Sequence, residues 1–457
     1  MANDREMAQK IALRVREAGG TAYYVGGYVR DTLLGLDCKD IDLEIHGIPP
    51  EMLLEVLSSL GEPDCFGESF GIFRLRHYSL DIAMPRSERA VGAGHKDFLC
   101  SLDPCIGTRQ AAIRRDFTVN ALMQDVLSGE IIDPFGGRKD LENHLLRHMD
   151  SRRFAEDPLR VLRAAQFAAR FEFRIAPETL ILCGEMDLST LPGERVFSEM
   201  EKALLKSSRP SIFWDTLRSM GQLGVWFPEL QDLIAVPQSP KYHPEGDVWT
   251  HTMLVLNHAA ALRGRTEQPL SLMLSALCHD FGKSTSTSVT EDGAIHAIGH
   301  EIAGLPLAER FLRRMTRDRK LIRTVLNMTE LHMRPNMYVA QGAGFKSYNR
   351  VFDMSVSPAD LLLLCRADAL GSGCDPAVYA KTEEELHRHL QDYRTLMSRP
   401  GVSGQDLVDA GFHPGPHFHA ALDYAHKLQL SGVDRKSALA QTLAFLRRAE
   451  SESNNRV

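Results

Sequence analysis

Two aspartates separated by a single residue, Asp40 and Asp42, are the first side chains in this sequence whose spacing could do chemistry. Residues i and i+2 of an extended strand lie on the same face, so both carboxylates would project into one site. Such a pair suits Mg²⁺, a hard ion that takes oxygen ligands and keeps positions open for a substrate phosphate. The spacing predicts a magnesium site; the alternative is a solvated strand end.

A strand, a glycine turn, a helix and a second strand are the elements that must position these aspartates. An apolar run over Ala22–Val25 reaches Gly26 and Gly27, a charged helical segment follows, and the second strand carries the carboxylates. Glycines have no Cβ, so backbone N–H groups can approach a phosphate closely. Arg30, one turn into the helix, would add its charge to the helix N-terminus. This order predicts a phosphate-binding turn beside the metal site.

Two motifs of this region together resemble one enzyme family. GGYVRDTLLG followed by DID resembles the first motif of the class II nucleotidyltransferases, which include tRNA CCA-adding enzymes and bacterial poly(A) polymerases, and RRDFTVNAL resembles the second. The resemblance implies that Gly27, Arg30 and Arg115 hold a nucleoside triphosphate. It also implies a third carboxylate, Asp81, followed by a flexible polar loop over Arg86–Asp97. The alternatives are an ordinary strand-end aspartate and a plain surface connection.

A carboxylate and a guanidinium three residues apart, Asp157 and Arg160, occur in AEDPLRVLRAAQFAARF, where apolar spacing predicts a helix from Ala155. An acceptor-only carboxylate with a donor-only guanidinium matches cytosine and adenine and repels uracil and guanine. Protein could thus replace a nucleic-acid template; the alternative is a local ion pair. EDPLR also resembles the family's base-selecting motif, which implies that role for this pair and a triphosphate contact for Arg163. Many relatives have a further arginine where this chain has Gln166.

A second set of metal-binding side chains occurs beyond residue 248. Apolar helical segments carry them at their ends: His251, His279, Asp280, His300, His332 and Asp368. The order of His251, the His279-Asp280 tandem and Asp368 resembles the HD phosphohydrolase superfamily, which holds one or two divalent metals, and the other two histidines are weaker candidates. Imidazole with carboxylate suits Mn²⁺, Ni²⁺ or Co²⁺, which can activate water against a phosphoester. For each histidine taken singly, a structural role is the alternative.

Length and composition limit the class of protein. At 457 residues and 44% apolar content, the chain can bury several cores. Met7, Ile11 and Val15 at helical spacing predict an amphipathic helix, and no apolar run is long enough to span a bilayer, which favours a cytoplasmic protein without a membrane partner. Eight single cysteines are expected to be reduced thiols. A net charge of −7 gives the whole chain no general affinity for polyanions.

We predict an α+β fold arranged in consecutive segments. A nucleotidyltransferase-type mixed β-sheet with helices is expected over residues 1–148, and an all-helical neck with the base-selecting motif over residues 149–210. A proline-containing linker over 211–240 then precedes an all-helical HD domain over 241–395 and a helical tail over 396–457.

The resemblance spans nearly the whole chain and implies a CCA-adding enzyme that extends the tRNA 3′ end from CTP and ATP. Its implied catalytic residues are Asp40, Asp42 and Asp81, with Mg²⁺ at the first two. Enzymes that add only A, and poly(A) polymerases, share most of these residues. An HD metal phosphohydrolase that acts on 2′,3′-cyclic or terminal phosphates, with an RNA-binding N-terminal half, is the alternative from another class. The sequence leaves a homodimer through the HD domain open.

Overall fold

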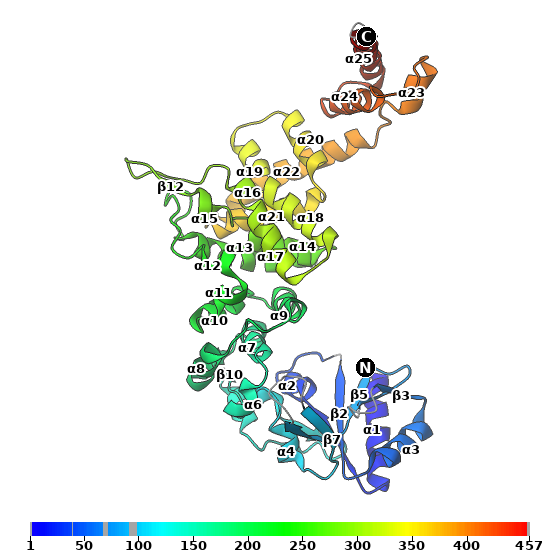
Figure 1. The fold of residues 1–457 in the computed structure, drawn as a ribbon, viewed down its shortest axis with the longest axis vertical. Helices are drawn as coiled ribbons and strands as arrows, with labels where there is room; N and C mark the ends of the chain where they lie inside the picture. The colour runs from blue at the N-terminus through cyan, green and yellow to red at the C-terminus, as the bar shows by residue number, and fades with distance from the viewer. Residues whose placement is uncertain (1, 39, 67–71, 91–97, 455–457) are drawn as a thin grey trace. The chain divides into compact units, whose positions relative to one another are not determined.

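A computed structural model describes residues 2–38, 40–66, 72–90 and 98–454 of the chain. Its elements form two compact units, residues 1–203 with 212–226 and residues 204–211 with 227–457. The predicted α+β class is confirmed, because a mixed sheet with helices is followed by a region that is almost wholly helical (Figure 1). The five-segment division is finer than these two units and stays a prediction.

The first unit is built on a seven-stranded sheet with the order β3-β4-β5-β2-β1-β8-β9. Its central strand β2 pairs antiparallel with β1 and parallel with β5. The strands are β1 Thr21–Val25, β2 Ile41–His46, β3 Pro63–Phe66, β4 Ile72–Leu75, β5 Leu80–Ala83, β8 Met123–Asp125 and β9 Ile131–Ile132. Because β2 and β5 are parallel neighbours, the first residues of both strands lie at the same end of the sheet.

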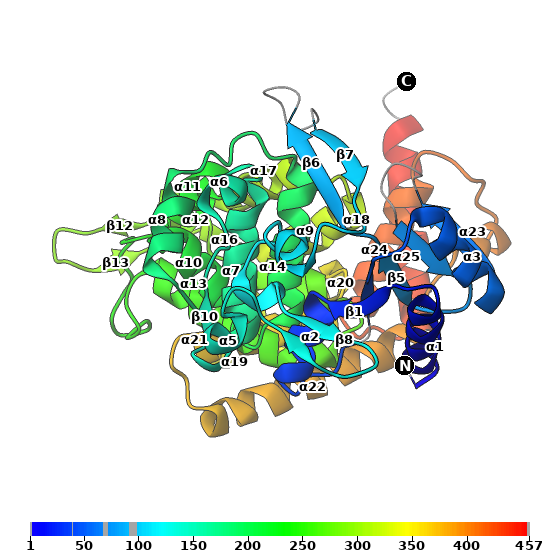
Figure 2. The same cartoon turned by 90° about the horizontal axis from the view of Figure 1, so that it is seen from below.

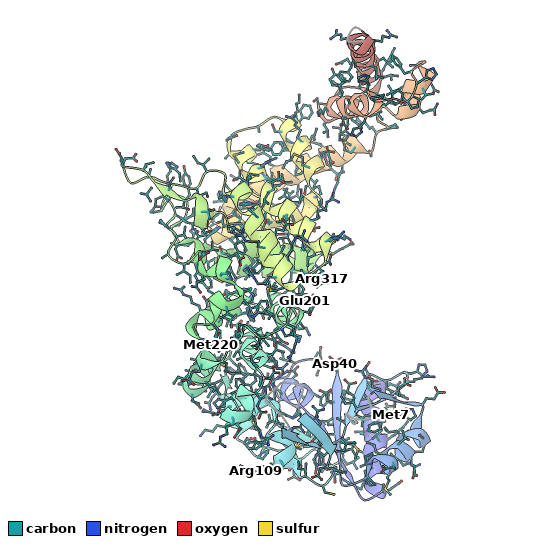
Figure 3. The ribbon with its side chains drawn as sticks, viewed as in Figure 1. Met7, Asp40, Arg109, Glu201, Met220 and Arg317 are labelled. Atoms are coloured by element: carbon teal, nitrogen blue, oxygen red, sulfur yellow. The ribbon has the colours of Figure 1, made fainter. Side chains whose placement is uncertain are left out.

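The predicted N-terminal amphipathic helix is confirmed as α1, Ala2–Glu17. It packs against β1 and β2, and its residues Met7, Ile11 and Val15 are buried (Met7 is labelled in Figure 3). The other helical elements of this unit, with two short paired strands, are α2 Gly27–Leu33, α3 Pro50–Leu60, α4 Thr108–Ala112, η1 Thr118–Asn120, α5 Gly137–Glu142, β10 Leu145–Leu146, α6 Ser151–Ala155, α7 Leu159–Phe171, β11 Arg174–Ile175, α8 Pro177–Glu185, α9 Gly193–Lys206, α10 Ser211–Ser219 and α11 Leu223–Trp226.

Two local predictions are corrected. The expected loop over Arg86–Asp97 begins as a strand, because β6 (Arg86–Ala90) pairs with β7 (Phe98–Leu102) in a two-stranded ribbon (Figure 2); residues 91–97 lie outside the described residues. The helix predicted from Ala155 begins only at Leu159 as α7, and Ala155 is instead the last residue of the short preceding helix α6. The chain leaves helical geometry before Pro158, which disfavours helix in the preceding residue, and the carboxylate of Asp157 accepts the backbone N–H of Leu159 at 3.1 Å.

The second unit is a helical domain followed by a small bundle of tail helices. Its elements are α12 Pro228–Gln231, α13 Val248–Leu262, η2 Arg263–Arg265, α14 Pro269–Cys278, α15 Lys283–Ser286, β12 Ser288–Val289, β13 Ile295–His296, α16 His300–Ala303, α17 Leu305–Met315, α18 Arg319–Leu331, α19 Met333–Ala340, α20 Phe345–Met354, α21 Pro358–Gly371, α22 Pro376–Met397, α23 Gly404–Asp409, α24 Phe418–Leu430 and α25 Arg435–Asn454. Aspartate N-caps start three of the longer helices, since Asp247, Asp318 and Asp375 accept backbone N–H groups of α13, α18 and α22. Within the described residues, every helix is too short or too polar to cross a membrane.

Candidate functional sites

Three carboxylates meet at a pocket in the sheet of the first unit. Asp42 in β2 and Asp81 in β5 are directly paired in the parallel register, and Asp40 lies exposed just before β2 (Figure 3). Together with Arg74 and Tyr78 they line a pocket of about 260 Å³. Arg74 donates to Asp81 with 3.1 Å between Nη2 and Oδ2. The pocket therefore presents carboxylate oxygens from two adjacent strands, a donor set that fits a hard divalent cation.

The electrostatics of Asp42 reflect this crowding. Burial raises the pKa of its carboxyl, the charge of Arg115 lowers it, and Asp81 and Asp40 raise it again, with a net upward shift. A cation bound between these carboxylates would favour their ionised forms. The charge distribution therefore also fits a divalent metal.

The glycine turn lies beside Asp42, one of the pocket's carboxylates. Gly26 has φ 66° and ψ −132° and caps α2, which Gly27 begins. A Cβ at Gly26 would lie 2.8 Å from Nη1 of Arg115 and 3.6 Å from Oδ2 of Asp42. Only a glycine both adopts this backbone conformation readily and leaves room for the two side chains. The predicted turn, one predicted arginine and one predicted carboxylate are thus brought together.

Arg30 is placed differently from the other predicted arginines. It is buried, and it donates to Asp31 (Nε to Oδ1, 2.7 Å) and to Asn120 (Nη1 to Oδ1, 2.5 Å). Its guanidinium also lies over the ring of Phe171, 4.5 Å from the centroid. These contacts tie α2 to η1 and α7, so Arg30 supports the glycine turn from inside the unit.

Arg115 and Arg163 each contact a buried carboxylate. Nη2 of Arg115 lies 3.5 Å from Oε2 of Glu44, and Nε of Arg163 donates to Oδ2 of Asp116 at 2.7 Å. Burial raises the pKa of Asp116, but the charge of Arg163 and a hydrogen bond from Asn120 outweigh it, so the net shift is downward. Sequence reasoning missed Glu44, although it continues the i, i+2 alternation of Asp40 and Asp42 and so lies on the same face of β2.

Asp157 and Arg160 are held by separate partners. Oδ2 of Asp157 lies 3.2 Å from Nη2 of Arg195, whereas Arg160 donates to the carbonyl oxygens of Arg153 at 2.5 Å and Arg114 at 3.1 Å. In the described part of the chain no ion pair joins the two, so the alternative of a simple local ion pair is not observed. Gln166 is buried in α7, with 2% of its surface exposed.

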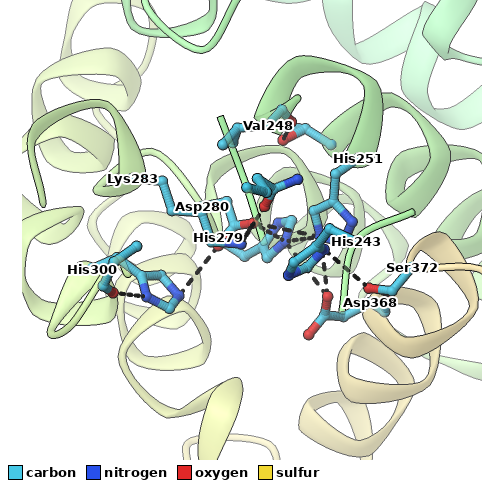
Figure 4. A network of polar contacts seen from close by, with 12 residues as sticks. His243, Val248, His251, His279, Asp280, Lys283, His300, Asp368 and Ser372 are labelled. Atoms are coloured by element: carbon cyan, nitrogen blue, oxygen red, sulfur yellow. Dashed lines mark hydrogen bonds and ion pairs between the residues drawn. The ribbon is translucent and has the colours of Figure 1, made fainter. Parts of the chain in front are cut away.

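The second unit brings six candidate side chains into one cluster, and Figure 4 labels all of them except His332. They are His251 in α13, His279 and Asp280 after α14, His300 at the start of α16, His332 between α18 and α19, and Asp368 in α21. Nε2 of His251 lies 3.2 Å from Nε2 of His279 and 3.1 Å from Oδ1 of Asp368. Oδ1 of Asp280 lies 3.2 Å from Nε2 of His300 and 4.0 Å from Nε2 of His332. The two weaker candidates therefore belong to the same cluster.

The orientation of the imidazoles fits metal binding. Nδ1 of His279, His300 and His332 contacts the carbonyl oxygen three residues earlier, at 2.9, 2.8 and 2.6 Å. These contacts leave Nε2 facing the cluster, as in many metal sites. In the described part of the chain, both carboxylate oxygens of Asp280 and Nε2 of His300 and His332 are buried without a well-aligned hydrogen bond, although Lys283 lies 2.7 Å from Oδ2 of Asp280 and His300 lies 3.2 Å from its Oδ1. Buried imidazole and carboxylate groups that converge with so few aligned hydrogen bonds are the observation that favours a bound divalent cation.

The pKa shifts in the cluster are also compatible with metal binding. Burial lowers the pKa of His251, but its hydrogen bonds to Asp368 and Glu245 outweigh this and raise the pKa to about 9. Burial lowers the pKa of His332 to about 3, so that ring is neutral. Burial raises the pKa of Asp280, but the charges of His279 and Lys283 hold that pKa well below its usual range. The cluster thus stabilises positive charge and keeps a neutral imidazole available as a ligand.

Sequence reasoning missed the side chains that support this cluster. Oε1 of Glu245 lies 2.8 Å from Nδ1 of His251 and 2.9 Å from Nδ1 of His243. Lys283 lies 2.7 Å from Asp280 and donates to Gln238 at 2.7 Å. Three of these four residues lie in or beside the proline-containing tract that was predicted as a linker. The HPE sequence just before a predicted metal-binding helix was the signal that could have revealed them.

A glycine sets the close approach of two elements in this unit. A Cβ at Gly282, two residues after Asp280, would lie 2.0 Å from the carbonyl oxygen of His300 and 2.6 Å from the backbone nitrogen of Gly304. Without a side chain, the turn after α14 can pack directly onto α16. This contact brings His300 to Asp280.

Known family models match the regions of the chain that contain both candidate sites. Models of the poly A polymerase head domain, the probable RNA and SrmB-binding site of polymerase A, and the HD domain match residues 22–147, 172–234 and 248–372. The multifunctional CCA protein of Actinobacillus pleuropneumoniae serotype 5b is 40% identical over 367 residues, covering 76% of this chain and 85% of the relative. That of Mannheimia succiniciproducens is 38% identical over 408 residues, covering 85% and 92%.

Solved structures share the fold along nearly the whole chain. The Bacillus stearothermophilus CCA-adding enzyme in complex with CTP has a TM-score of 0.67 at 20% identity, with 97% of both chains covered. The Thermotoga maritima CCA-adding enzyme complexed with tRNA has a TM-score of 0.61 at 19% identity, with 96% of this chain and 95% of that chain covered. At this identity the likeness shows the fold alone. The identity to the curated relatives goes further, and the chain belongs to the multifunctional CCA protein family of CCA-adding tRNA nucleotidyltransferases.

Proposed function

We propose that this chain adds C, C and A to the 3′ end of tRNA from CTP and ATP. The observation that carries the proposal is the pairing of Asp42 with Asp81 at one pocket, with the Gly26 turn lying beside both Asp42 and Arg115. This arrangement combines a carboxylate pair for metal with a backbone turn and a cation for phosphate. It lies in the region that resembles the poly A polymerase head domain.

The proposed roles follow from where each side chain lies. Enzymes of this class use divalent metal, and we assign Mg²⁺ to Asp40 and Asp42, with Asp81 as the third catalytic carboxylate. Bound Mg²⁺ would supply Lewis acidity at the primer 3′-hydroxyl and at the leaving pyrophosphate. Gly27 offers its backbone N–H to the triphosphate, and Arg115 adds charge there.

The remaining triphosphate residues act from the helices behind the turn. Arg163 is held by Asp116, which fixes the direction of its guanidinium and supports the proposed triphosphate contact. Arg30 is assigned to the same site, and its bonds to Asp31 and Asn120 support an action through the turn that it anchors.

We assign base selection to Asp157 and Arg160. Arg195 holds the carboxylate, and two backbone carbonyl groups hold the guanidinium. The carboxylate can accept from the exocyclic amino group of cytosine or adenine, and the guanidinium can donate to the adjacent ring nitrogen. Separate partners leave both groups oriented without neutralising each other.

The test uses tRNA transcripts that end at the discriminator base, at C or at CC, each incubated with labelled CTP, ATP, UTP or GTP and Mg²⁺. We expect CTP incorporation on the first two and ATP incorporation on the third. ATP use only on the CC transcript would instead indicate an A-adding enzyme, and long A tails a poly(A) polymerase. No incorporation would contradict the proposal.

The HD cluster supports a second activity, hydrolysis of 2′,3′-cyclic or terminal phosphates. Its converging Nε2 atoms and carboxylate oxygens suit Ni²⁺, Mn²⁺ or Co²⁺, and a bound ion of this kind would lower the pKa of water for attack on phosphorus. Hydrolysis of a 2′,3′-cyclic nucleotide by the full chain, with each metal in turn, tests this. His279→Ala should abolish it and Asp42→Ala should leave it unchanged.

Two further expectations belong to this proposal. A tRNA substrate favours a cytoplasmic location, which fractionation of cells that express the chain would test. Dimerisation through the HD domain stays a prediction, which light scattering on the full chain would test.

A further inference from the structure

Basic residues concentrate at the turn between α17 and α18 in the second unit. Residues 310–323, RFLRRMTRDRKLIR, contain six arginines, one lysine and a single acid, in a chain with 53 basic and 60 acidic residues. Six of these basic side chains are exposed, and we call them the α17–α18 basic surface: Arg310, Arg313, Arg317, Arg319, Lys320 and Arg323 (Arg317 is labelled in Figure 3). Like charges at this density repel one another in the free protein.

The local acids do not balance this charge. Asp318 caps α18, where its carboxylate accepts two backbone N–H groups at 2.9 and 3.0 Å. Glu309 is occupied by Arg313, with 2.8 Å between Oε1 and Nε. The seventh basic residue, Arg314, contacts Glu229 at 2.9 and 2.6 Å and serves the fold. Among the described residues, five members of the surface have no ion pair: Arg310, Arg317, Arg319, Lys320 and Arg323.

A groove of about 450 Å³ joins the two helices at this surface. Its lining includes three basic side chains from both helices, Arg313, Arg319 and Arg323, and two acids that are each paired with an arginine, Glu309 with Arg313 and Glu330 with Arg334. Met354 and Val356 add apolar surface, and Asn327 fixes this wall by donating to the Met354 carbonyl at 2.9 Å and accepting from the Val356 N–H at 2.8 Å. Guanidinium groups beside an apolar wall match a nucleotide, since phosphate pairs with arginine and a base can cover apolar or guanidinium surface.

We infer that the α17–α18 basic surface binds the phosphate backbone of RNA, with one nucleotide in the groove. The choice of tRNA as the RNA rests on the proposed function. Arginine predominates over lysine here, which favours phosphate recognition by paired N–H groups. The 13 residues of α18 separate the turn from His332 by about 20 Å. The basic turn therefore supplies affinity for RNA at a distance from the HD cluster, whereas the groove extends along α18 as far as Glu330.

The test measures binding of a labelled tRNA transcript without CCA to the full chain by fluorescence anisotropy, over about 50 to 200 mM salt. The variant Arg317→Ala/Arg319→Ala/Arg323→Ala should raise Kd about tenfold at low salt. It should also reduce the slope of log K against log salt by about 2, because fewer counterions are released. A second variant, Arg317→Gln/Lys320→Gln, should weaken binding in the same direction if the triple variant does not fold.

The matched control removes the same charge from α22 of the same unit, in Lys381→Ala/Arg388→Ala/Arg394→Ala, three exposed positions. It should leave Kd and the salt slope unchanged. Equal losses in both triple variants, or an unchanged Kd and slope in the α17–α18 variants, would overturn the inference. Loss of binding to anionic lipid vesicles with unchanged RNA binding would also overturn it. If the wild-type chain incorporates CTP while the α17–α18 variants bind RNA normally, the inference fails and the proposed function stands.

Discussion

The two candidate metal-binding regions differ in how closely the protein alone brings the proposed ligands together. In the HD cluster, the ligand atoms of His251, His279 and Asp280 lie within 4.8 Å of one another, and all three side chains are buried. Among the described residues, Asp40 and Asp42 belong to no group of three that meets this distance. Asp40 is exposed and Asp42 only half-buried. One region is assembled in advance, whereas the other presents oxygen ligands at an open surface.

This difference matches the chemistry each region would perform. An open carboxylate pair leaves coordination positions for the phosphates of a nucleotide, so substrate can complete the metal site. A buried cluster of imidazoles with fixed Nδ1 contacts can hold a metal before any substrate arrives. The two regions should therefore respond to mutation independently, and each with its own readout.

The largest expected effect is that of Asp42→Asn on nucleotide incorporation. The substitution keeps the shape of the side chain and removes the charge that would hold Mg²⁺, so CTP incorporation should fall about 1,000-fold. The metal content of the HD cluster should not change. Steady-state incorporation and elemental analysis of the same preparation measure both.

Asp64→Asn is the matched control for this variant. Asp64 lies in β3 of the same sheet, with 47% of its side chain exposed, and its substitution should leave incorporation unchanged. A comparable loss in both variants would show that the sheet, rather than the carboxylate at β2, had been disturbed.

Asp280→Asn should produce the next largest effect, on the other region. Both oxygens of Asp280 face the cluster, so loss of the charge should weaken divalent metal binding more than about 100-fold. In the wild type, metal at about 100 times its Kd would stabilise the folded unit by about 3 kcal/mol, so a chelator should lower Tm. The chelator should have no effect on the variant.

Calorimetry with and without chelator checks this result, with CTP incorporation as the second readout. Asp392→Asn on the exposed surface of α22 is the control and should retain the chelator-dependent Tm. A wild-type Tm that is insensitive to chelator after loading with Ni²⁺, Mn²⁺ or Co²⁺ would contradict a metal-binding HD cluster.

Glu245→Gln tests how much of the HD cluster depends on its supporting side chains. Glutamine keeps an oxygen near Nδ1 of His251 but removes the charge, and metal affinity should fall about tenfold to 100-fold. Glu301→Gln is the control, since Oε2 of Glu301 is 3.8 Å from Nδ1 of His300 and a backbone carbonyl already contacts that nitrogen. Equal effects on metal titrations would argue against a special role for Glu245.

How much of this could be predicted from sequence depends on how local each feature is. The glycine turn, the aspartate pair and the His279-Asp280 tandem are short motifs whose geometry is set within one or two elements, so they can be recognised in the sequence. The burial of Arg30 was not predicted, because Asn120 and Phe171, which enclose it, lie far along the chain.

The features that were missed have tertiary causes. Glu245 supports His251 from a loop whose prolines suggested a linker, so its role depends on the packing of that loop against α13. The basic residues of the α17–α18 basic surface are dense in the sequence, but the groove that places arginines of both helices beside Met354 and Val356 forms only when the helices pack together. The late start of α7 depends on Pro158 and on the hydrogen bond that the Asp157 carboxylate accepts from the backbone of Leu159.

The smallest expected effect concerns base selection at the nucleotidyltransferase site. Asp157→Asn replaces an acceptor-only group with an amide that can also donate, so it can pair with the carbonyl oxygen of uracil. Incorporation of UTP relative to CTP on a transcript ending at the discriminator base should rise about tenfold. Competition between the two nucleotides measures this ratio directly.

Arg195→Ala separates the chemistry of Asp157 from its orientation. The substitution keeps the Asp157 carboxylate and removes the guanidinium that lies 3.2 Å from it. The side chain of Arg195 is 49% exposed and that of Asp157 is 33% exposed. Such a pair contributes only about 0 to 1 kcal/mol, so UTP discrimination should change less than in Asp157→Asn. If both variants relaxed selection equally, orientation by Arg195 would determine selectivity. This open site would then resemble the HD cluster, in which supporting residues fix the groups that act.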